Sequence, residues 1–130
     1  MKIRVEDGLP YITASLTYRG QSLQIEKALL DTGSAGTVLS ADRVLDIGLQ
    51  YEMSDIVHRI RGVGGAEFVY SKQIDRFAVD DLEVREFEVE IGAMDYGFQI
   101  DGIVGLDFLL QVGASIDLAQ LEIGPSVSGE

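Results

Sequence analysis

ALLDTGSAGTVL, residues 28–39, places a single carboxylate, Asp31, between two apolar segments. The segments have the composition of strands, and the small residues between them predict a tight turn in which Gly33 and Gly36 permit positive φ and close backbone approach. Such a turn exposes Asp31 and surrounds it with backbone N–H donors. The same pattern also fits an ordinary turn between two strands, because short motifs of this kind recur by chance.

A second motif, IDGIVGLDFLL at residues 100–110, contains two apolar residues and a glycine ahead of a short helical pattern. Together with Asp31-Thr32-Gly33, it resembles the retroviral-type (retropepsin-type) aspartic peptidases. In that family, a catalytic Asp-Thr-Gly loop is cradled by a loop that ends in such a triplet, here Ile103-Val104-Gly105.

Two further segments extend the resemblance over roughly Lys27 to Ile123. GLDFL at residues 105–109, followed by SIDL at residues 115–118, is similar to the branch of DNA-damage-inducible and bacterial single-domain members. RGVGG at residues 61–65 resembles the glycine-rich tip of the flap, the hairpin that covers the substrate. The motifs stand in the family's order, so the resemblance implies an acid-protease β-barrel whose single lobe acts as a homodimer.

Peptide hydrolysis by carboxylates needs two of them, because one takes a proton from the attacking water while the other donates a proton to the carbonyl oxygen. Neighbouring carboxylates do not both ionise easily, so such a pair shares a proton. The chain has one Asp-Thr-Gly, and the resemblance therefore implies an aspartic endopeptidase site built from Asp31 of two copies.

The resemblance assigns the catalytic role to Asp31, Thr32 and Gly33. Thr32 would hydrogen-bond across the pair of loops, and Gly33 would donate its backbone N–H to the carboxylate. The nucleophile is a water molecule activated between the carboxylates, so no cofactor and no metal is implied.

The resemblance also implies which residues bind a polypeptide substrate. They belong to the turn, the flap tip and the supporting loop, and they are Ser34, Gly62, Val63, Gly64, Gly65, Ile103 and Val104. We expect the Ser34 hydroxyl to donate to the Asp31 carboxylate and to lower the pKa of the pair. A hydroxyl that only stabilises the turn is an equal alternative. The glycines of the tip would let the hairpin open and close, although a hairpin without a ligand also has such a tip.

The apolar residues that flank the motifs favour an apolar cleft, which by the resemblance would prefer extended peptides with apolar side chains beside the scissile bond. One position departs from the family, since Arg61 stands where retroviral flaps often carry Gly. A cation there either stiffens the hairpin or lies near the cleft.

Composition limits the partners. The chain of 130 residues is expected to form one domain, residues 1–130, and its net charge of −12 argues against nucleic acid and anionic membrane as partners. It contains no cysteine, and no apolar stretch has the length of a signal peptide core or a membrane span. We therefore expect a cytoplasmic location.

Periodicity and turn residues predict a mainly β fold, a closed or nearly closed barrel with one or two short helices. Asp7 to Pro10 is expected to form a turn, Ser40 to cap a helix and Gly48 to end it. The expected strands are residues 2–5, 11–18, 23–30, 57–60, 68–74, 77–79, 82–84, 87–91 and 115–123, and the expected helices are residues 41–47 and 106–112.

Other chemistries find little support in the sequence. One histidine, His58, and no cysteine leave too few ligands for a zinc site, and no nucleophile elbow surrounds Ser34. Asp107 is expected to act on the helix dipole, and Asp80-Asp81 to form a hairpin turn. The serious alternative is a catalytically silent module of the same fold that dimerises or binds peptides.

Overall fold

The computed structural model describes residues 1–62 and 65–126, and it shows a mainly β protein with two short helices, as the sequence predicts. The strands are β1 (Arg4–Glu6), β2 (Leu9–Tyr18), β3 (Gln21–Leu30), β4 (Val38–Ser40), β5 (Val57–Gly62), β6 (Gly65–Val79), β7 (Leu82–Gly92), β8 (Gly102–Val104), β9 (Ala114–Asp117) and β10 (Glu122–Pro125). The helices are α1 (Ala41–Val44), which continues into the 3-10 turn η1 (Leu45–Ile47), and α2 (Leu106–Val112). No helix in the described ranges is long and apolar enough to cross a membrane.

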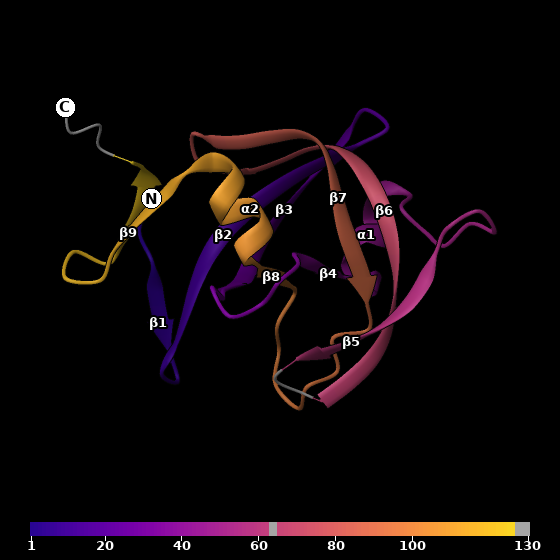
Figure 1. Ribbon diagram of the computed structural model, residues 1–130, viewed down its shortest axis with the longest axis horizontal. Coiled ribbons are helices and arrows are strands. Elements are labelled where there is room, and N and C mark those ends of the chain that lie inside the picture. The colour runs from indigo at the N-terminus through magenta and orange to yellow at the C-terminus, as the bar shows by residue number, and fades with distance from the viewer. Residues whose placement is uncertain (63–64, 127–130) are drawn as a thin grey trace.

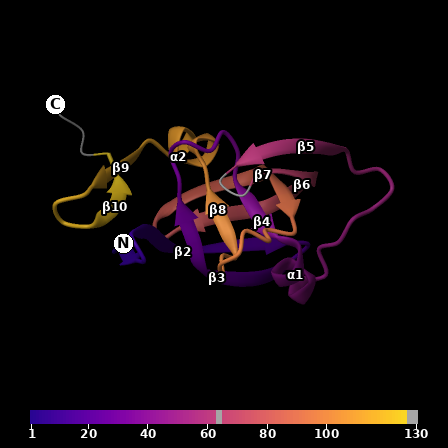
Figure 2. The same cartoon turned by 90° about the horizontal axis from the view of Figure 1, so that it is seen from below.

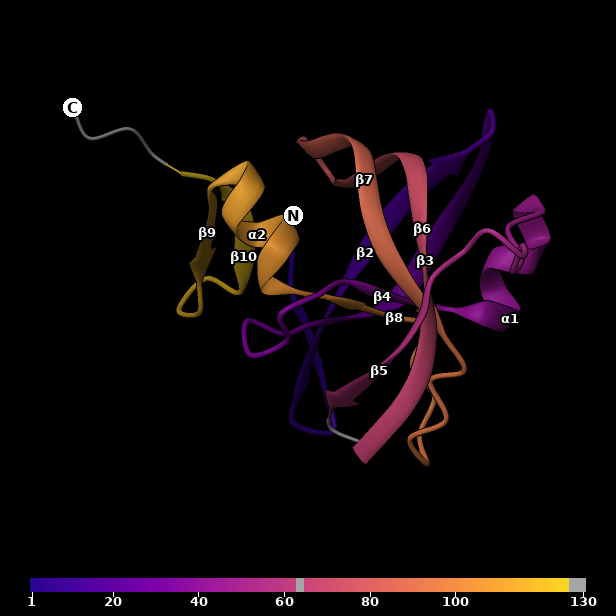
Figure 3. The ribbon, with the colours of Figure 1, turned by 45° about the vertical axis from the view of Figure 1, so that its right-hand side comes forward.

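Six strands close into a ring in the order β2, β3, β8, β4, β7, β6, and β6 pairs back onto β2 (Figures 1 and 3). The pairs β3–β8 and β4–β7 are parallel, whereas β4–β8 is antiparallel. β1 and β5 lie outside the ring as additional strands on β2 and β6. The expected closed or nearly closed barrel is confirmed, and closure leaves few strand edges to cover.

Helix α2 covers the interior of the ring because its buried face is aromatic and aliphatic. Phe108 is completely buried, with its ring centroid 5.1 Å from that of Phe77 and 6.0 Å from that of Phe87. The alternating burial along β2 supplies Ile12, Leu16 and their neighbours to the same core. Burial of these side chains fixes which face of each strand points inward.

Two strands are longer than the sequence predicts. β6 and β7 were each expected as two short strands, yet they pair continuously from Tyr70↔Ile91 to Val79↔Leu82 with one irregularity. At that irregularity Glu86 has a φ of 52°, and the ladder resumes with Ile74↔Phe87. Only the pair Asp75–Glu86 is missing from this ladder, and the register is the same on both sides of it, so neither strand ends there.

The predicted turns and helix ends are mostly as expected. Ser40 caps α1 by accepting a hydrogen bond from the Arg43 N–H at 3.4 Å, and Gly48 ends the helical segment with a φ of 75°. The second half of that segment is the tighter turn η1, not α-helix. Leu9 and Pro10, expected in a turn, begin β2 because Asp7 and Gly8 complete the turn by themselves with positive φ.

The two ends of the described chain lie together, outside the ring (Figure 2). The predicted strand region 115–123 forms the hairpin β9–β10. Its second strand pairs with the N-terminal residues of the same chain: Ile3 donates its N–H to Leu121 at 2.8 Å, and Ile123 donates to Met1 at 2.9 Å.

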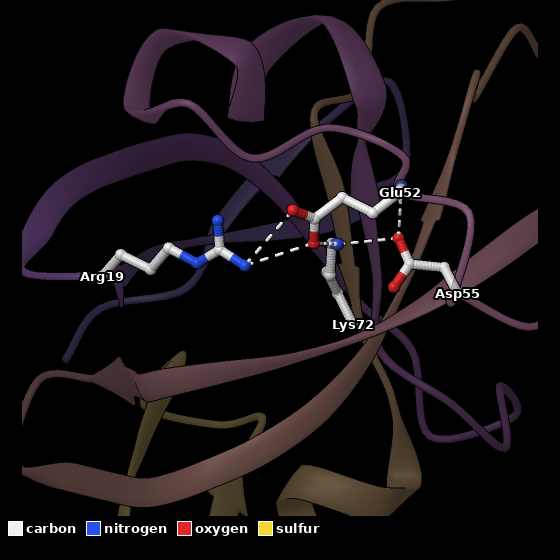
Figure 4. A network of polar contacts seen from close by, with 4 residues as sticks. All are labelled: Arg19, Glu52, Asp55 and Lys72. Carbon is white, nitrogen blue, oxygen red and sulfur yellow. Dashed lines mark hydrogen bonds and ion pairs between the residues drawn. The ribbon is translucent and has the colours of Figure 1, made fainter.

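A charged network fixes the segment that leads into β5 (Figure 4). The side chain of Lys72 on β6 is 5% exposed, and its ammonium lies 2.6 Å from Glu52 and 2.7 Å from Asp55. Arg19, in the turn after β2, reaches Glu52 at 3.2 Å. Hydrogen bonds from Lys72 hold the pKa of both carboxyl groups below their ordinary values. Burial acts to lower the pKa of Lys72, but the bonds to Asp55 and Glu52 outweigh it and raise that pKa.

We predict that this network makes stability depend on pH. Depressed carboxyl pKa values contribute stability above the ordinary values of 4.5 and 3.8, and that stability is lost as pH falls through the folded values. Lys72→Met should therefore unfold at a lower temperature than wild type at pH 7, and the difference should shrink towards pH 3. Thermal unfolding across this range is the measurement. Arg59→Met, which removes an exposed cation without an ion pair in the described chain, is the control. A constant difference would contradict the assignment.

Candidate functional site

The loop that carries Asp31 leaves the end of β3 and is held by backbone hydrogen bonds. β3 runs parallel to β8, with Leu29 opposite Ile103 and Leu30 opposite Val104. The Asp31 N–H continues this pairing by donating to the Val104 carbonyl at 3.0 Å. Gly33 donates its N–H to Oδ1 of Asp31 at 2.9 Å, as expected from the sequence. The carboxylate is therefore oriented by its own loop.

Gly105 brings the second motif against this loop. A Cβ on Gly105 would lie 2.4 Å from the Gly36 carbonyl oxygen and 2.9 Å from that of Ser34, closer than real Cβ atoms approach backbone. The next residue, Leu106, donates its N–H to the Ser34 carbonyl at 2.7 Å. Only glycine fits between the two loops, which gives the physical reason for the apolar-apolar-Gly triplet.

Thr37 and Asp107 join the two loops through side chains. The Thr37 hydroxyl donates to Oδ1 of Asp107 at 2.8 Å and accepts the Gly105 N–H at 3.1 Å, while the Thr37 N–H donates to Oδ2 at 3.1 Å. Asp107 lies in the first turn of α2, as expected, and its Oδ1 also accepts the Phe108 N–H at 2.8 Å. The Thr37 contacts are a second role, which the sequence did not predict. The role of Thr37 was not predicted from the sequence. The feature that indicates it is a hydroxyl residue placed between the turn that ends at Gly36 and the apolar strand β4.

The expected role of Ser34 is not the one in the structure. Its hydroxyl donates to the Gly36 carbonyl at 2.8 Å, so its one proton is not directed at the Asp31 carboxylate. Ser34 therefore stabilises the turn, which was the alternative interpretation.

Two cavities adjoin the loop and form one groove under β5. The first, of about 370 Å³, is lined by Asp31, Gly33, Ser34, Val38, Ile60, Arg61, Tyr96 and Ile103. The second, of about 510 Å³, is lined by Ser34, Ala35, Gly36, Val38, Ile60, Arg61, Glu86, Phe87, Glu88, Glu90, Asp107 and Gln111. Four residues line both cavities, so the groove continues from Asp31 along β7.

The structure brings four of the predicted site residues to this groove. Asp31, Gly33, Ser34 and Ile103 line it, and Thr32 is exposed beside it. Val104 was expected to bind substrate, but it is 1% exposed in the main core, because it alternates with Ile103 along β8 and points to the other side. It supports the loop without reaching the groove.

The predicted flap is the hairpin β5–β6, and Gly62 pairs with Gly65 at its end. Val63 and Gly64, expected at the tip, lie outside the described residues. Two alternatives were open for Arg61, stiffening of the hairpin and a position near the cleft. Arg61 lines both cavities, which favours the position near the cleft. Tyr96, from the loop between β7 and β8, also lines the groove and was not singled out from the sequence.

The second cavity is more polar than the expected apolar cleft, because β7 presents alternate acidic side chains to it. Glu86 and Glu88 have no ion pair among the described residues. The Glu90 carboxylate is occupied, since it hydrogen-bonds with Nε2 of His58 at 2.9 Å and with the Ser71 hydroxyl at 2.9 Å. Arg61 is the one cationic residue among the described residues that line this cavity. Because carboxylates outnumber it, this end of the groove favours cationic groups.

In residues 1–62 and 65–126, no three His, Cys, Asp or Glu side chains gather in a way that could hold a metal ion.

Residues 14–108 match the protein-family model described as Aspartyl protease. The match runs from β2 into α2 and so includes the Asp31 loop, the β5–β6 hairpin and Gly105. No curated protein matches the chain.

We predict that Gly105→Ala destabilises the protein severely, because its Cβ would collide with backbone and not with a movable side chain. The expected loss is more than about 3 kcal/mol of unfolding free energy, the range of strained or overpacked sites. Gly124→Ala is the matched control, since a Cβ there meets nothing within 4 Å, and it should change stability by less than about 0.5 kcal/mol. Denaturant unfolding of the three proteins measures both values, and equal stabilities would contradict the close approach.

Proposed function

Since the chain belongs to the aspartyl protease family, we propose that it hydrolyses peptide bonds as a homodimer of the retropepsin type. The observation that carries the proposal is the position of Asp31: its carboxylate lines the groove and accepts a hydrogen bond from the Gly33 N–H. One carboxylate per chain is half of the pair that this chemistry needs. A second copy of the chain would supply the other half.

The proposed mechanism uses the two Asp31 carboxylates with one shared proton. The ionised carboxylate takes a proton from a water molecule, whose oxygen attacks the peptide carbonyl carbon, and the protonated carboxyl donates to the carbonyl oxygen. Collapse of the tetrahedral intermediate then returns a proton to the leaving amine. The Gly33 N–H keeps Asp31 in one orientation throughout, and Thr32 would link the two loops across the dimer.

The exposed face of the loop supports this arrangement. Thr32, Gly33 and Ala35 are all exposed next to Asp31, so a second copy could approach there without displacing the core. The N-terminal residues and β10 already pair within one chain. We therefore place the proposed contact between subunits at the Asp31 loops and not in an exchange of these two terminal segments.

A peptide-binding module without turnover is the second candidate. The observation that favours it is the edge strand β5, which pairs only with β6 in the described residues and lies over the groove. An extended peptide could add to this edge by backbone hydrogen bonds. The two candidates share the groove and differ in what Asp31 does.

We predict that Asp31→Asn separates the candidates. Amide replacement keeps the size of the side chain but removes the base, so cleavage of a peptide library should fall by at least about 10³-fold. Binding of the best peptide to the variant should persist. Asp46→Asn, an exposed change in η1, is the control and should cleave like wild type. Binding without cleavage by wild type would favour the module instead.

We also predict a charge preference along the groove. Peptides with apolar residues at the scissile bond and a lysine at the end that reaches the second cavity should be cleaved faster than the same peptides with glutamate. Exposed ion pairs predict a difference of about 2- to 5-fold. Glu88→Lys should reverse the preference, whereas Glu26→Lys, on exposed β3 surface outside the groove, should not. Unchanged selectivity in Glu88→Lys would show that β7 does not contact the peptide.

A further inference from the structure

The hairpin that covers the groove extends beyond the sheet that supports it. Pairing between β6 and β7 ends at Tyr70↔Ile91, so residues 65–69 of β6 pair only with β5. Phe68 in this extension is 73% exposed. The far end of the hairpin therefore needs another contact if it is to keep a fixed position over Asp31.

Glu67 and Tyr96 supply a polar contact of this kind. Glu67 lies in the extension, and Tyr96 lies in the loop between β7 and β8, which runs beside the hairpin (Figures 1 and 3). The Tyr96 hydroxyl donates to Oε1 of Glu67, and the Met94 N–H donates to Oε2 at 3.4 Å. One carboxylate thus holds two residues of the loop against the hairpin.

The surroundings leave room for this contact and keep its donor protonated. A Cβ on Gly92 would lie 2.9 Å from Oε2 of Glu67, so the glycine at the end of β7 admits the carboxylate. Burial, followed by the hydrogen bond to Glu67, raises the pKa of Tyr96 above its ordinary range. The hydroxyl therefore remains a donor at any pH at which the protein would work.

Tyr96 also lines the cavity that contains Asp31. Its ring packs against a smaller hydrophobic cluster, separate from the main core, that contains Ile103 beside the Asp31 loop. Ile60 of the hairpin packs against the same cluster. The Tyr96 side chain thus forms part of the cavity wall and ties that wall to the hairpin. Loss of the hydroxyl alone would leave the wall in place but free the hairpin from it.

We propose that Tyr96 is a positioning residue, whose hydroxyl latches the hairpin to the 93–99 loop through Glu67 and so fixes the two walls of the cavity facing Asp31. The inference rests on the proposed peptidase function, since it assigns these residues a part in holding the peptide. Among the described residues, neither side chain is hydrogen-bonded to the Asp31 carboxylate.

The test is Tyr96→Phe, which removes only the hydroxyl, together with Glu67→Ala and the double variant. If the contact positions the substrate, KM should be about 5- to 20-fold higher in each single variant, because a loosely held wall binds peptide more weakly. The kcat of each variant should stay within about 2-fold of wild type. Amide hydrogen exchange in residues 65–70 and 93–99 should accelerate in both variants. The double variant should be no worse than either single variant, because the two groups act through one contact.

Tyr51→Phe is the matched control, because the Tyr51 ring is half exposed against Tyr70 and lies away from the cavity. It should change neither KM nor exchange. A merely structural role for Tyr96 predicts a different pattern, a lower kcat from fewer folded molecules at unchanged KM, and that pattern would overturn the proposal. So would additive effects in the double variant.

The two proposals fail in different ways. If wild type cleaves peptides and Tyr96→Phe matches it in KM and in exchange, the latch is wrong and the peptidase function stands. If wild type cleaves no peptide, the proposed peptidase function is wrong, and the positioning role that rests on it is wrong as well. Hydrogen exchange in the two segments then decides whether the contact still couples hairpin and loop.

Discussion

The close approach of Gly105 to the Ser34–Gly36 turn is the constraint on which the rest of the site depends. Two backbone segments from distant parts of the chain meet at a distance that excludes any side chain. Thr37 and Asp107 then satisfy the polar groups that this contact buries. Buried backbone groups need such partners, so the contact fixes the Asp31 loop, the start of α2 and their relative position together.

The ring of strands makes that approach possible, because parallel pairing of β3 with β8 carries both motifs to the same end of the barrel. β5 and β6 then pass over the Asp31 loop and enclose the groove from the other side. Their two ends are anchored differently. The Lys72 network holds the segment that leads into β5. The Glu67–Tyr96 contact holds the opposite end of the hairpin, near the start of β6.

Features written in short stretches of sequence were predictable. The Asp31 loop and the Gly105 motif are recognisable in the sequence as small residues beside apolar segments. In the structure the two motifs are in direct contact. The orientation of Val104 was not predictable, because one residue of register decides which neighbour on β8 faces the groove. The contact of Glu67 with Tyr96 was not predictable either, because it joins residues 29 positions apart in the chain and requires the continuous pairing of β6 with β7, which local patterns do not specify.

The central claim is that one active site requires Asp31 from two chains. Its most direct test is cleavage by mixtures of wild-type and Asp31→Asn chains, allowed to exchange subunits at constant total concentration. If both carboxylates are required, activity follows the square of the wild-type fraction, and an equal mixture retains about one quarter of the activity. Activity that falls in proportion to the wild-type fraction, with about half retained in the equal mixture, would show that each chain acts alone.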